Sequence, residues 1–182
     1  MIFEPITFID KKGRTVLLRS AKSSDAEINI EYLKVTTGET RYLSKEPSEI
    51  TLTLEDERNF LSQKAEAPRE LMLLAFVNGE HAGNASFSAV GRGLRVAHRC
   101  EIGIALYQRY CGCGIGRRML ETVLRAAKDA GYEQAELRVV ADNLRAIALY
   151  QSCGFEKVGV CPHEMKYPDG SYADGYVMVK KF

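Results

Sequence analysis

Short apolar stretches of strand length recur along the chain, and turn residues separate them. The apolar run Leu71–Val77 is followed by Asn78-Gly79, the dipeptide that most strongly indicates a tight hairpin turn. A turn at Lys11-Lys12-Gly13 similarly joins two shorter apolar stretches. The pattern predicts strands within residues 6–21, 69–90, 91–108, 133–140, 155–161 and 171–182.

Four other segments have the spacing or the end signals of helices. Residues 23–38 begin with cap residues and end at Gly38, and residues 51–66 carry Thr53 as cap and Asp56 in the first turn. Residues 115–132 end at Gly131, and residues 142–155 begin at Asp142 or Asn143. The expected apolar faces are Ile28, Tyr32 and Leu33 in the first helix, and Met119, Leu120, Val123, Leu124 and Ala127 in the third.

The order of these elements predicts one α+β domain. Strands dominate the first half, and a strand–helix–strand–helix–strand–strand series follows. We expect a central mixed, mostly antiparallel sheet of about seven strands with helices on both faces. A chain of 182 residues is long enough to bury a core, and no linker or repeat divides it, so residues 1–182 are predicted to form a single domain.

Composition narrows the function classes. Apolar residues make up 46% and charged residues 27%, which is typical of a globular protein. The net charge of +1 provides no basic field for nucleic acid. The first residues lack the pattern of a signal peptide, and no apolar run could span a bilayer, so we expect a cytoplasmic protein without membrane contact. Five scattered cysteines indicate reduced thiols, and their spacing predicts no metal site.

The segment Cys111–Gly116 contains three glycines between a predicted strand and a predicted helix. Unpaired N–H groups at a helix start favour anions, and glycines let a phosphate approach the backbone. A P-loop would need Gly-Lys-Ser/Thr, and a dinucleotide fingerprint would need G-x-G-x-x-G, so neither fits. The segment therefore predicts a phosphate-bearing ligand of another kind, or a tight turn without a ligand.

Two blocks make the sequence similar to a known superfamily. The segment "CEIGIALYQRYCGCGIGRRML" and the later "AELRVVADNLRAIALYQSCGF" resemble the GCN5-related N-acetyltransferases (GNAT). The blocks cover about residues 100–155. The resemblance implies a glycine loop that binds the pyrophosphate of acetyl-CoA, and a second stretch, Asn143 to Phe155, that completes the cofactor site. No metal is implied.

The resemblance also implies the cofactor contacts. In one register Arg109 opens the loop motif. In the other, which we prefer because Ile115 then begins the helix, Cys111 stands where Gln or Arg is usual. The side-chain charge on the pyrophosphate then comes from Arg109, Arg117 or Arg118. The implied cofactor-binding residues are Ile104, Ala105, Leu106, Cys111, Gly112, Cys113, Gly114, Ile115, Gly116, Arg117, Asn143, Ala146 and Tyr150.

Tyr150 and Glu101 are the candidate catalytic residues. In the family the tyrosine faces the coenzyme sulfur and can protonate the leaving thiolate, although by itself Tyr150 also fits a core aromatic. A carboxylate can take the proton of the attacking amine, and alternation along the strand puts Glu101 on the face of Gly103 and Ala105, opposite Cys100 and Ile102. A solvated glutamate is the plain alternative, and His98 is a second candidate base.

The predicted function is transfer of acetyl from acetyl-CoA to a primary amine of a small molecule or a protein N-terminus. The alternative is an acyl-CoA-binding sensor without turnover, and a metal- or nucleotide-binding domain is a third, weaker interpretation. The resemblance implies an acceptor pocket lined by residues 32–60 and 161–176. It implies an amine-bearing small molecule or peptide as partner and is compatible with a homodimer.

Overall fold

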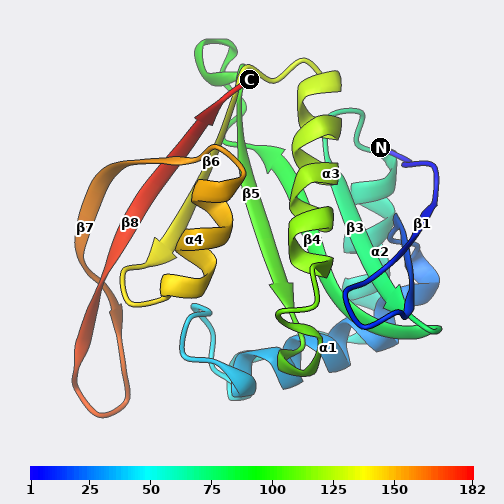
Figure 1. Cartoon of the computed structure of the whole chain (residues 1–182), viewed down its shortest axis with the longest axis horizontal. Coiled ribbons are helices and arrows are strands. Elements are labelled where there is room, and N and C mark those ends of the chain that lie inside the picture. Colours follow the sequence, from blue (N-terminus) through cyan, green and yellow to red (C-terminus); the bar gives the residue numbers. More distant parts are fainter.

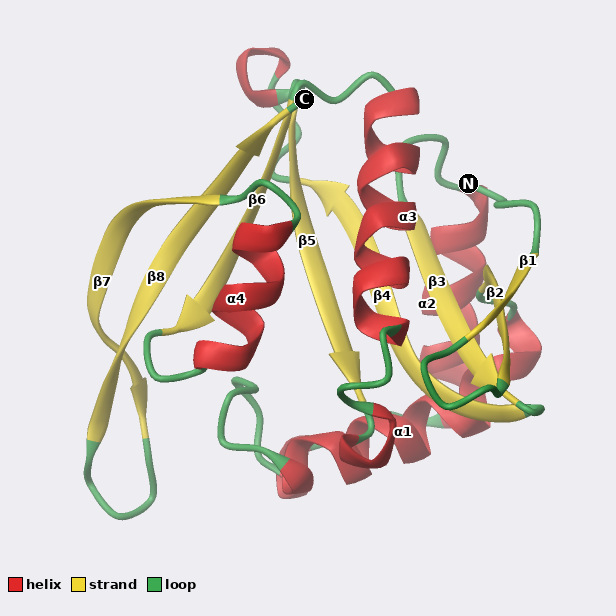
Figure 2. Ribbon diagram, in the orientation of Figure 1, coloured by secondary structure: helices red, strands yellow, loops and turns green.

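The computed structural model describes residues 1–182 as one eight-stranded sheet with four principal helices (Figures 1 and 2). The strand order is β1-β2-β3-β4-β5-β6-β8-β7, and every neighbouring pair is antiparallel except β5 and β6. This confirms the mixed, mostly antiparallel sheet, with eight strands rather than about seven. The strands are β1 (Ile6–Ile9), β2 (Thr15–Ser20), β3 (Leu71–Val77), β4 (Glu80–Ala89), β5 (Arg99–Leu106), β6 (Gln134–Val140), β7 (Glu156–Lys166) and β8 (Tyr172–Lys181).

The helices are α1 (Ala26–Glu39), α2 (Leu54–Glu66), α3 (Ile115–Asp129) and α4 (Leu144–Ser152). In Figure 2, α3 and α4 lie on the near side of the sheet and α2 lies behind it. None of the helices combines the length and the apolar composition needed to cross a bilayer.

Strand β3 sits between two apolar layers. Leu73 and Leu74 are both fully buried, but successive strand residues point to opposite faces. Leu73 belongs to the main core, which includes Met119 of α3, whereas Leu74 packs in a smaller cluster with Leu61 of α2. An uninterrupted apolar run is needed here because both faces of β3 are covered.

The predicted apolar face of α3 is confirmed, since all five of its members are buried in the main core. Beyond this helix, Gly131 has the positive φ of +82° that suits a helix C-terminus. Helix α1 differs from expectation in two ways. It continues through Gly38 to Glu39, and Ile28 is exposed while Asn29 is buried.

Asn29 is buried because it belongs to a row of hydrogen-bonded polar side chains that links α1 to α2 and β4. Its Nδ2 donates to Glu57 of α2 at 2.6 Å, and its Oδ1 accepts from Asn84 of β4. Asn84 in turn contacts His81 Nε2 at 2.8 Å. Buried polar groups require hydrogen-bond partners, so these contacts fix the rotation of α1 with Asn29 facing inward and Ile28 facing outward.

Strands β5 and β6 pair over only three positions and then separate. The paired residues are Arg99 with Gln134, Cys100 with Ala135, and Glu101 with Glu136. The rest of β5 pairs only with β4. Figure 1 shows the two strands diverging toward the end at which α3 and α4 begin, so one side of β5 is left without a neighbouring strand.

Candidate functional site

A cavity of about 800 Å³ lies where β5 and β6 have separated. Its walls come from the second half of β5, the end of β6, the glycine loop, the first turn of α3, helix α4 as far as Tyr150, and the C-terminal end of α1 with the segment that follows it. The structure thus brings the two sequence blocks together around one space. The predicted site residues that line the cavity are Ile104, Ala105, Leu106, Cys111, Gly112, Gly114, Gly116, Arg117, Asn143, Ala146 and Tyr150.

The glycine loop presents a row of free backbone donors. Helix α3 begins at Ile115, as the preferred register expects, and the N–H groups of residues 112–117 have no hydrogen-bond partner within the chain. Gly112 and Gly114 have φ values of +77° and +88°, which L side chains rarely adopt. These donors, at the positive end of a helix, form a cradle that fits a phosphate group.

Cys113 and Ile115 take part in this loop through their backbones only. Both side chains are buried in the main core, and neither lines the cavity. The thiol of Cys113 lies 3.5 Å from the carbonyl oxygen of Cys111. All five cysteines are free, and the chain has no group of three or more His, Cys, Asp or Glu side chains that could hold a metal ion.

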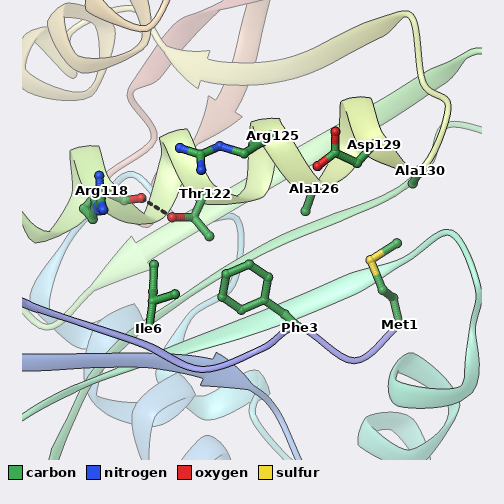
Figure 3. A pocket seen from close by; sticks show the side chains of 9 residues that line it. All are labelled: Met1, Phe3, Ile6, Arg118, Thr122, Arg125, Ala126, Asp129 and Ala130. Carbon is green, nitrogen blue, oxygen red and sulfur yellow. Dashed lines mark hydrogen bonds between the residues drawn. The ribbon is translucent and has the colours of Figure 1, made fainter.

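Among the three candidate arginines, only Arg117 lines the cavity. Arg109 lies 3.8 Å from Glu80 and stacks over two tyrosine rings outside the cavity. Arg118 turns to the other side of α3, where it lines a second cavity of about 300 Å³. Figure 3 shows that second cavity between α3 and the N-terminal segment, which contributes Met1 and Phe3. Apart from Arg118, it contains none of the residues predicted for the site.

The sequence analysis missed three basic residues of the main cavity, Lys11, Arg138 and Arg145. Arg145, in the first turn of α4, lies over the glycine loop, and its Nη2 would be 2.8 Å from a Cβ at Gly112. Its place two positions after Asn143, within the second motif block, was a usable signal. Lys11 comes from the β1–β2 turn and lies against Gly114. No sequence signal connected that turn to the motifs.

Tyr150 reaches the cavity from α4 and is 8% exposed. Its ring packs edge-on against Phe155, with centroids 6.0 Å apart, and its hydroxyl has no hydrogen-bond partner within the chain. Burial raises the pKa of Tyr150 to about 12. The phenol therefore stays protonated at neutral pH and is available as a proton donor.

Asn143 serves as the N-cap of α4. Its Oδ1 accepts a hydrogen bond from the backbone N–H of Ala146 at 3.2 Å. Its Nδ2 donates to no group of the protein, and the residue lines the cavity. One side-chain atom thus holds the helix start while the other remains free for a ligand.

The two candidate bases lie outside the cavity lining. Cys100 and Ile102 are buried and Glu101 is exposed, so the predicted alternation of β5 is confirmed. Gly103, on the same face as Glu101, lines the cavity, but Glu101 itself does not. His98 is exposed just before β5, where its carbonyl oxygen accepts from the backbone N–H of Glu133.

Of the two ranges expected to line an acceptor pocket, residues 32–60 and 161–176, only the first reaches the cavity. Residues Thr36, Glu39, Thr40, Tyr42 and Leu43 line the cavity, as the range 32–60 predicts, whereas no residue of 161–176 does. The β7–β8 hairpin instead contacts residues next to the opening. Arg138, in the cavity wall, pairs with Glu164 at 3.0 Å, and the Arg41 guanidinium stacks 3.9 Å from the centroid of the Tyr167 ring.

Comparison with curated proteins identifies relatives for part of the chain. The N-alpha-acetyltransferase RimI of Mycobacterium tuberculosis is 37% identical over 100 residues, which are 55% of this chain and 59% of RimI. The chain spans only 19%, 12% and 59% of the first three curated relatives.

Solved structures match nearly the whole chain. The GNAT-family acetyltransferase of Streptococcus pneumoniae has a TM-score of 0.88 and 30% identity, covering 92% of this chain and 99% of that one. The Salmonella typhimurium yncA protein, solved with its cofactor acetyl-CoA, shares the fold with a TM-score of 0.81 at 19% identity, covering 91% of this chain and 93% of that one. The model of the acetyltransferase (GNAT) family matches residues 37–155, which include the glycine loop, Tyr150 and every residue that lines the cavity except Lys11 and Thr36. On these grounds the chain belongs to the GNAT family of acetyltransferases.

Proposed function

We propose that the protein transfers the acetyl group of acetyl-CoA to a primary amine of a small molecule or of a protein N-terminus. One observation carries the proposal. A single cavity connects the free N–H groups of residues 112–117, which suit a phosphate, with the hydroxyl of Tyr150, which suits a leaving thiolate. In acetyl-CoA, a pyrophosphate and a thioester sulfur stand at the two ends of the pantetheine arm, which an acetyltransferase has to hold.

The donor would lie along the open side of β5. Its pyrophosphate would accept hydrogen bonds from the glycine loop, and Arg117 would add charge at the start of α3. The backbone groups of Ile104 and Leu106, beyond the last β5–β6 pair, would serve the amide-bearing arm of the coenzyme, whereas the carbonyl oxygen of Ala105 already accepts from the Tyr32 hydroxyl at 2.9 Å. The free Nδ2 of Asn143 would donate to the same arm.

Tyr150 would supply the proton that the reaction needs at sulfur. The amine nitrogen bonds to the acetyl carbonyl carbon, the carbon–sulfur bond breaks, and Tyr150 protonates the thiolate. The tyrosine then regains a proton from water. A phenol with a pKa near 12 is a weak acid. However, the burial that raises the pKa of the phenol also raises the pKa of a thiol in the same site, so the thiolate becomes a stronger proton acceptor.

Glu101 would act as the base through water. It lies two residues before Gly103 on the same face of β5, about 7 Å away at the rise of an extended strand. Water between them would carry the amine proton to the carboxylate. An α-amine, with a pKa of about 8, needs this help less than a lysine amine with a pKa near 10.4. That difference, together with the N-alpha specificity in the name of RimI, favours an α-amine acceptor.

A panel of amines tests the function directly. The purified protein is mixed with acetyl-CoA and a peptide α-amine, a free amino acid, a lysine-like amine or a polyamine, and release of the coenzyme thiol is measured. Thiol release above the amine-free blank, with acetylated product found by mass spectrometry, is expected for at least one α-amine. If acetyl-CoA binds but no amine in the panel yields acetylated product, the acyl-CoA sensor is the better interpretation.

A further inference from the structure

The β1–β2 turn is held in one shape by a buried carboxylate. Asp10 is 6% exposed and accepts hydrogen bonds from the backbone N–H groups of Lys12 and Arg14, at 2.8 and 3.0 Å. The guanidinium of Arg14 donates two more, at 2.9 and 2.7 Å. These four hydrogen bonds hold the backbone of the turn in one conformation.

This turn is attached to the glycine loop. The backbone N–H of Lys11 donates to the carbonyl oxygen of Cys113 at 3.0 Å. The aliphatic stem of Lys11 crosses the open side of Gly114, where a Cβ would lie 3.4 Å from Cγ and 3.6 Å from Cε of the lysine. The ammonium is one bond beyond Cε, and Lys11 lines the cavity. Both Lys11 and its neighbour Lys12 are exposed, but Lys12 does not line the cavity.

The charges around the loop leave this ammonium without a partner. Lys11 forms neither a salt bridge nor a side-chain hydrogen bond in the chain. The other basic residues that line this part of the cavity are Arg117 of α3 and Arg145 of α4. Of the two acidic lining residues, Glu39 already accepts from the backbone N–H of Gln108 at 2.7 Å. Three cations from three separate elements thus surround one row of free N–H donors.

We infer that Lys11 binds a phosphate group of the coenzyme, so that the β1–β2 turn is part of the cofactor site although it lies far upstream of both sequence blocks. The inference rests on the proposed binding of acetyl-CoA. It also gives Gly114 a second role, because a side chain larger than a methyl group would displace the lysine stem, and any side chain would strain the backbone.

Isothermal titration with acetyl-CoA tests this inference with a matched pair of variants. Lys11→Met keeps the stem against Gly114 and removes the charge, and Lys12→Met removes the neighbouring charge of the same turn. Lys11→Met is expected to raise Kd by about 5- to 30-fold, the range for one charge-assisted contact at a partly exposed site. Lys12→Met should change Kd by less than about twofold, and Lys11→Arg should restore most of the affinity.

Truncated ligands identify the phosphate. If the Lys11→Met defect persists with 3′-dephospho-acetyl-CoA, Lys11 binds the pyrophosphate, and if it disappears, Lys11 binds the 3′-phosphate. Either result supports the inference. Equal affinities of Lys11→Met and Lys12→Met for acetyl-CoA, or the same loss with acetyl-pantetheine, which has no phosphate, would overturn it. Failure of the parent protein to bind acetyl-CoA would instead remove the proposed function and this inference together.

Discussion

Replacing Tyr150 by phenylalanine separates its role as a proton donor from its role in packing. The substitution keeps the ring against Phe155 and removes only the hydroxyl, which has no partner within the chain. Because no intramolecular hydrogen bond is lost, the free energy of unfolding should change by less than about 0.5 kcal/mol. Loss of the hydroxyl should therefore appear in turnover and not in stability.

The expected loss of turnover follows from when the proton is needed. The thiolate forms only as the carbon–sulfur bond breaks, so the hydroxyl stabilises the transition state more than bound acetyl-CoA. We expect kcat to fall by about 10- to 100-fold, which corresponds to about 1.4–2.7 kcal/mol. The Kd of acetyl-CoA should change by less than about threefold, since water can replace much of one neutral hydrogen bond. Both are measured with an amine that the panel identifies.

Tyr132 provides the control. It is also buried, packs edge-on against Phe87 with centroids 5.8 Å apart, and lies outside the cavity. Its hydroxyl donates to the carbonyl oxygen of Arg69 at 2.9 Å. Tyr132→Phe should therefore cost about 0.5–1.5 kcal/mol of stability and leave kcat unchanged, the opposite of Tyr150→Phe.

The pH dependence gives a second check on Tyr150. Burial raises the pKa of Tyr150 to about 12, whereas a free tyrosine titrates near pH 10. If the rate falls near pH 10, ionisation of Tyr150 is therefore not the cause, and the same fall should be seen in Tyr150→Phe. Full kcat in a correctly folded Tyr150→Phe would refute the reasoning, because another acid or solvent would then protonate the thiolate. Tyr150 would be left with a packing role.

Three further predictions follow from single contacts. Gly114→Glu should weaken acetyl-CoA binding by at least about 100-fold in titration, because it puts a negative charge beside the phosphate cradle. Gly114→Ala has the same backbone strain without the charge, so the additional loss in Gly114→Glu measures the part due to the charged side chain. Burial raises the pKa of Glu57, so ionisation costs stability as pH rises through the folded-state pKa. Glu57→Gln, which keeps the acceptor for Asn29, should gain stability relative to the parent between pH 4.5 and 7.5 in urea unfolding, and a constant difference would contradict this. Glu101→Gln should lower kcat/KM by about tenfold or more for a lysine-like amine and by less for an α-amine. If the variant matches the parent in kcat/KM with every amine, Glu101 is not the base.

The local features of the fold and the site could be predicted from the sequence. The hairpin at Asn78-Gly79, the apolar face of α3 and the helix start at Ile115 each depend on residues within a few positions of one another. The same holds for the cap at Asn143, whose partner is the N–H of Ala146. Spacing along the chain contains all the information that such contacts require, so a single sequence is sufficient for them.

The charges around the cavity depended on the tertiary structure. The resemblance placed Arg117 among the cofactor-binding residues but did not exclude Arg109 or Arg118, and the rotation of α3 against the sheet puts Arg117 in the cavity and Arg118 on the far side. Alternation along β5 was predicted correctly, yet it did not reveal that the cavity begins beyond Glu101, because that boundary depends on where β6 separates.

Lys11 and Asn29 show the same limit at longer range. Lys11 meets Gly114 only because the β1–β2 turn packs against the glycine loop, and Asn29 turns inward only because α2 and β4 offer Glu57 and Asn84. The sequence alone determined which elements form and where the phosphate cradle begins, since both follow from short-range geometry. The tertiary structure decided which side chains surround that cradle, because those contacts form between elements whose mutual positions depend on the packing of the entire core.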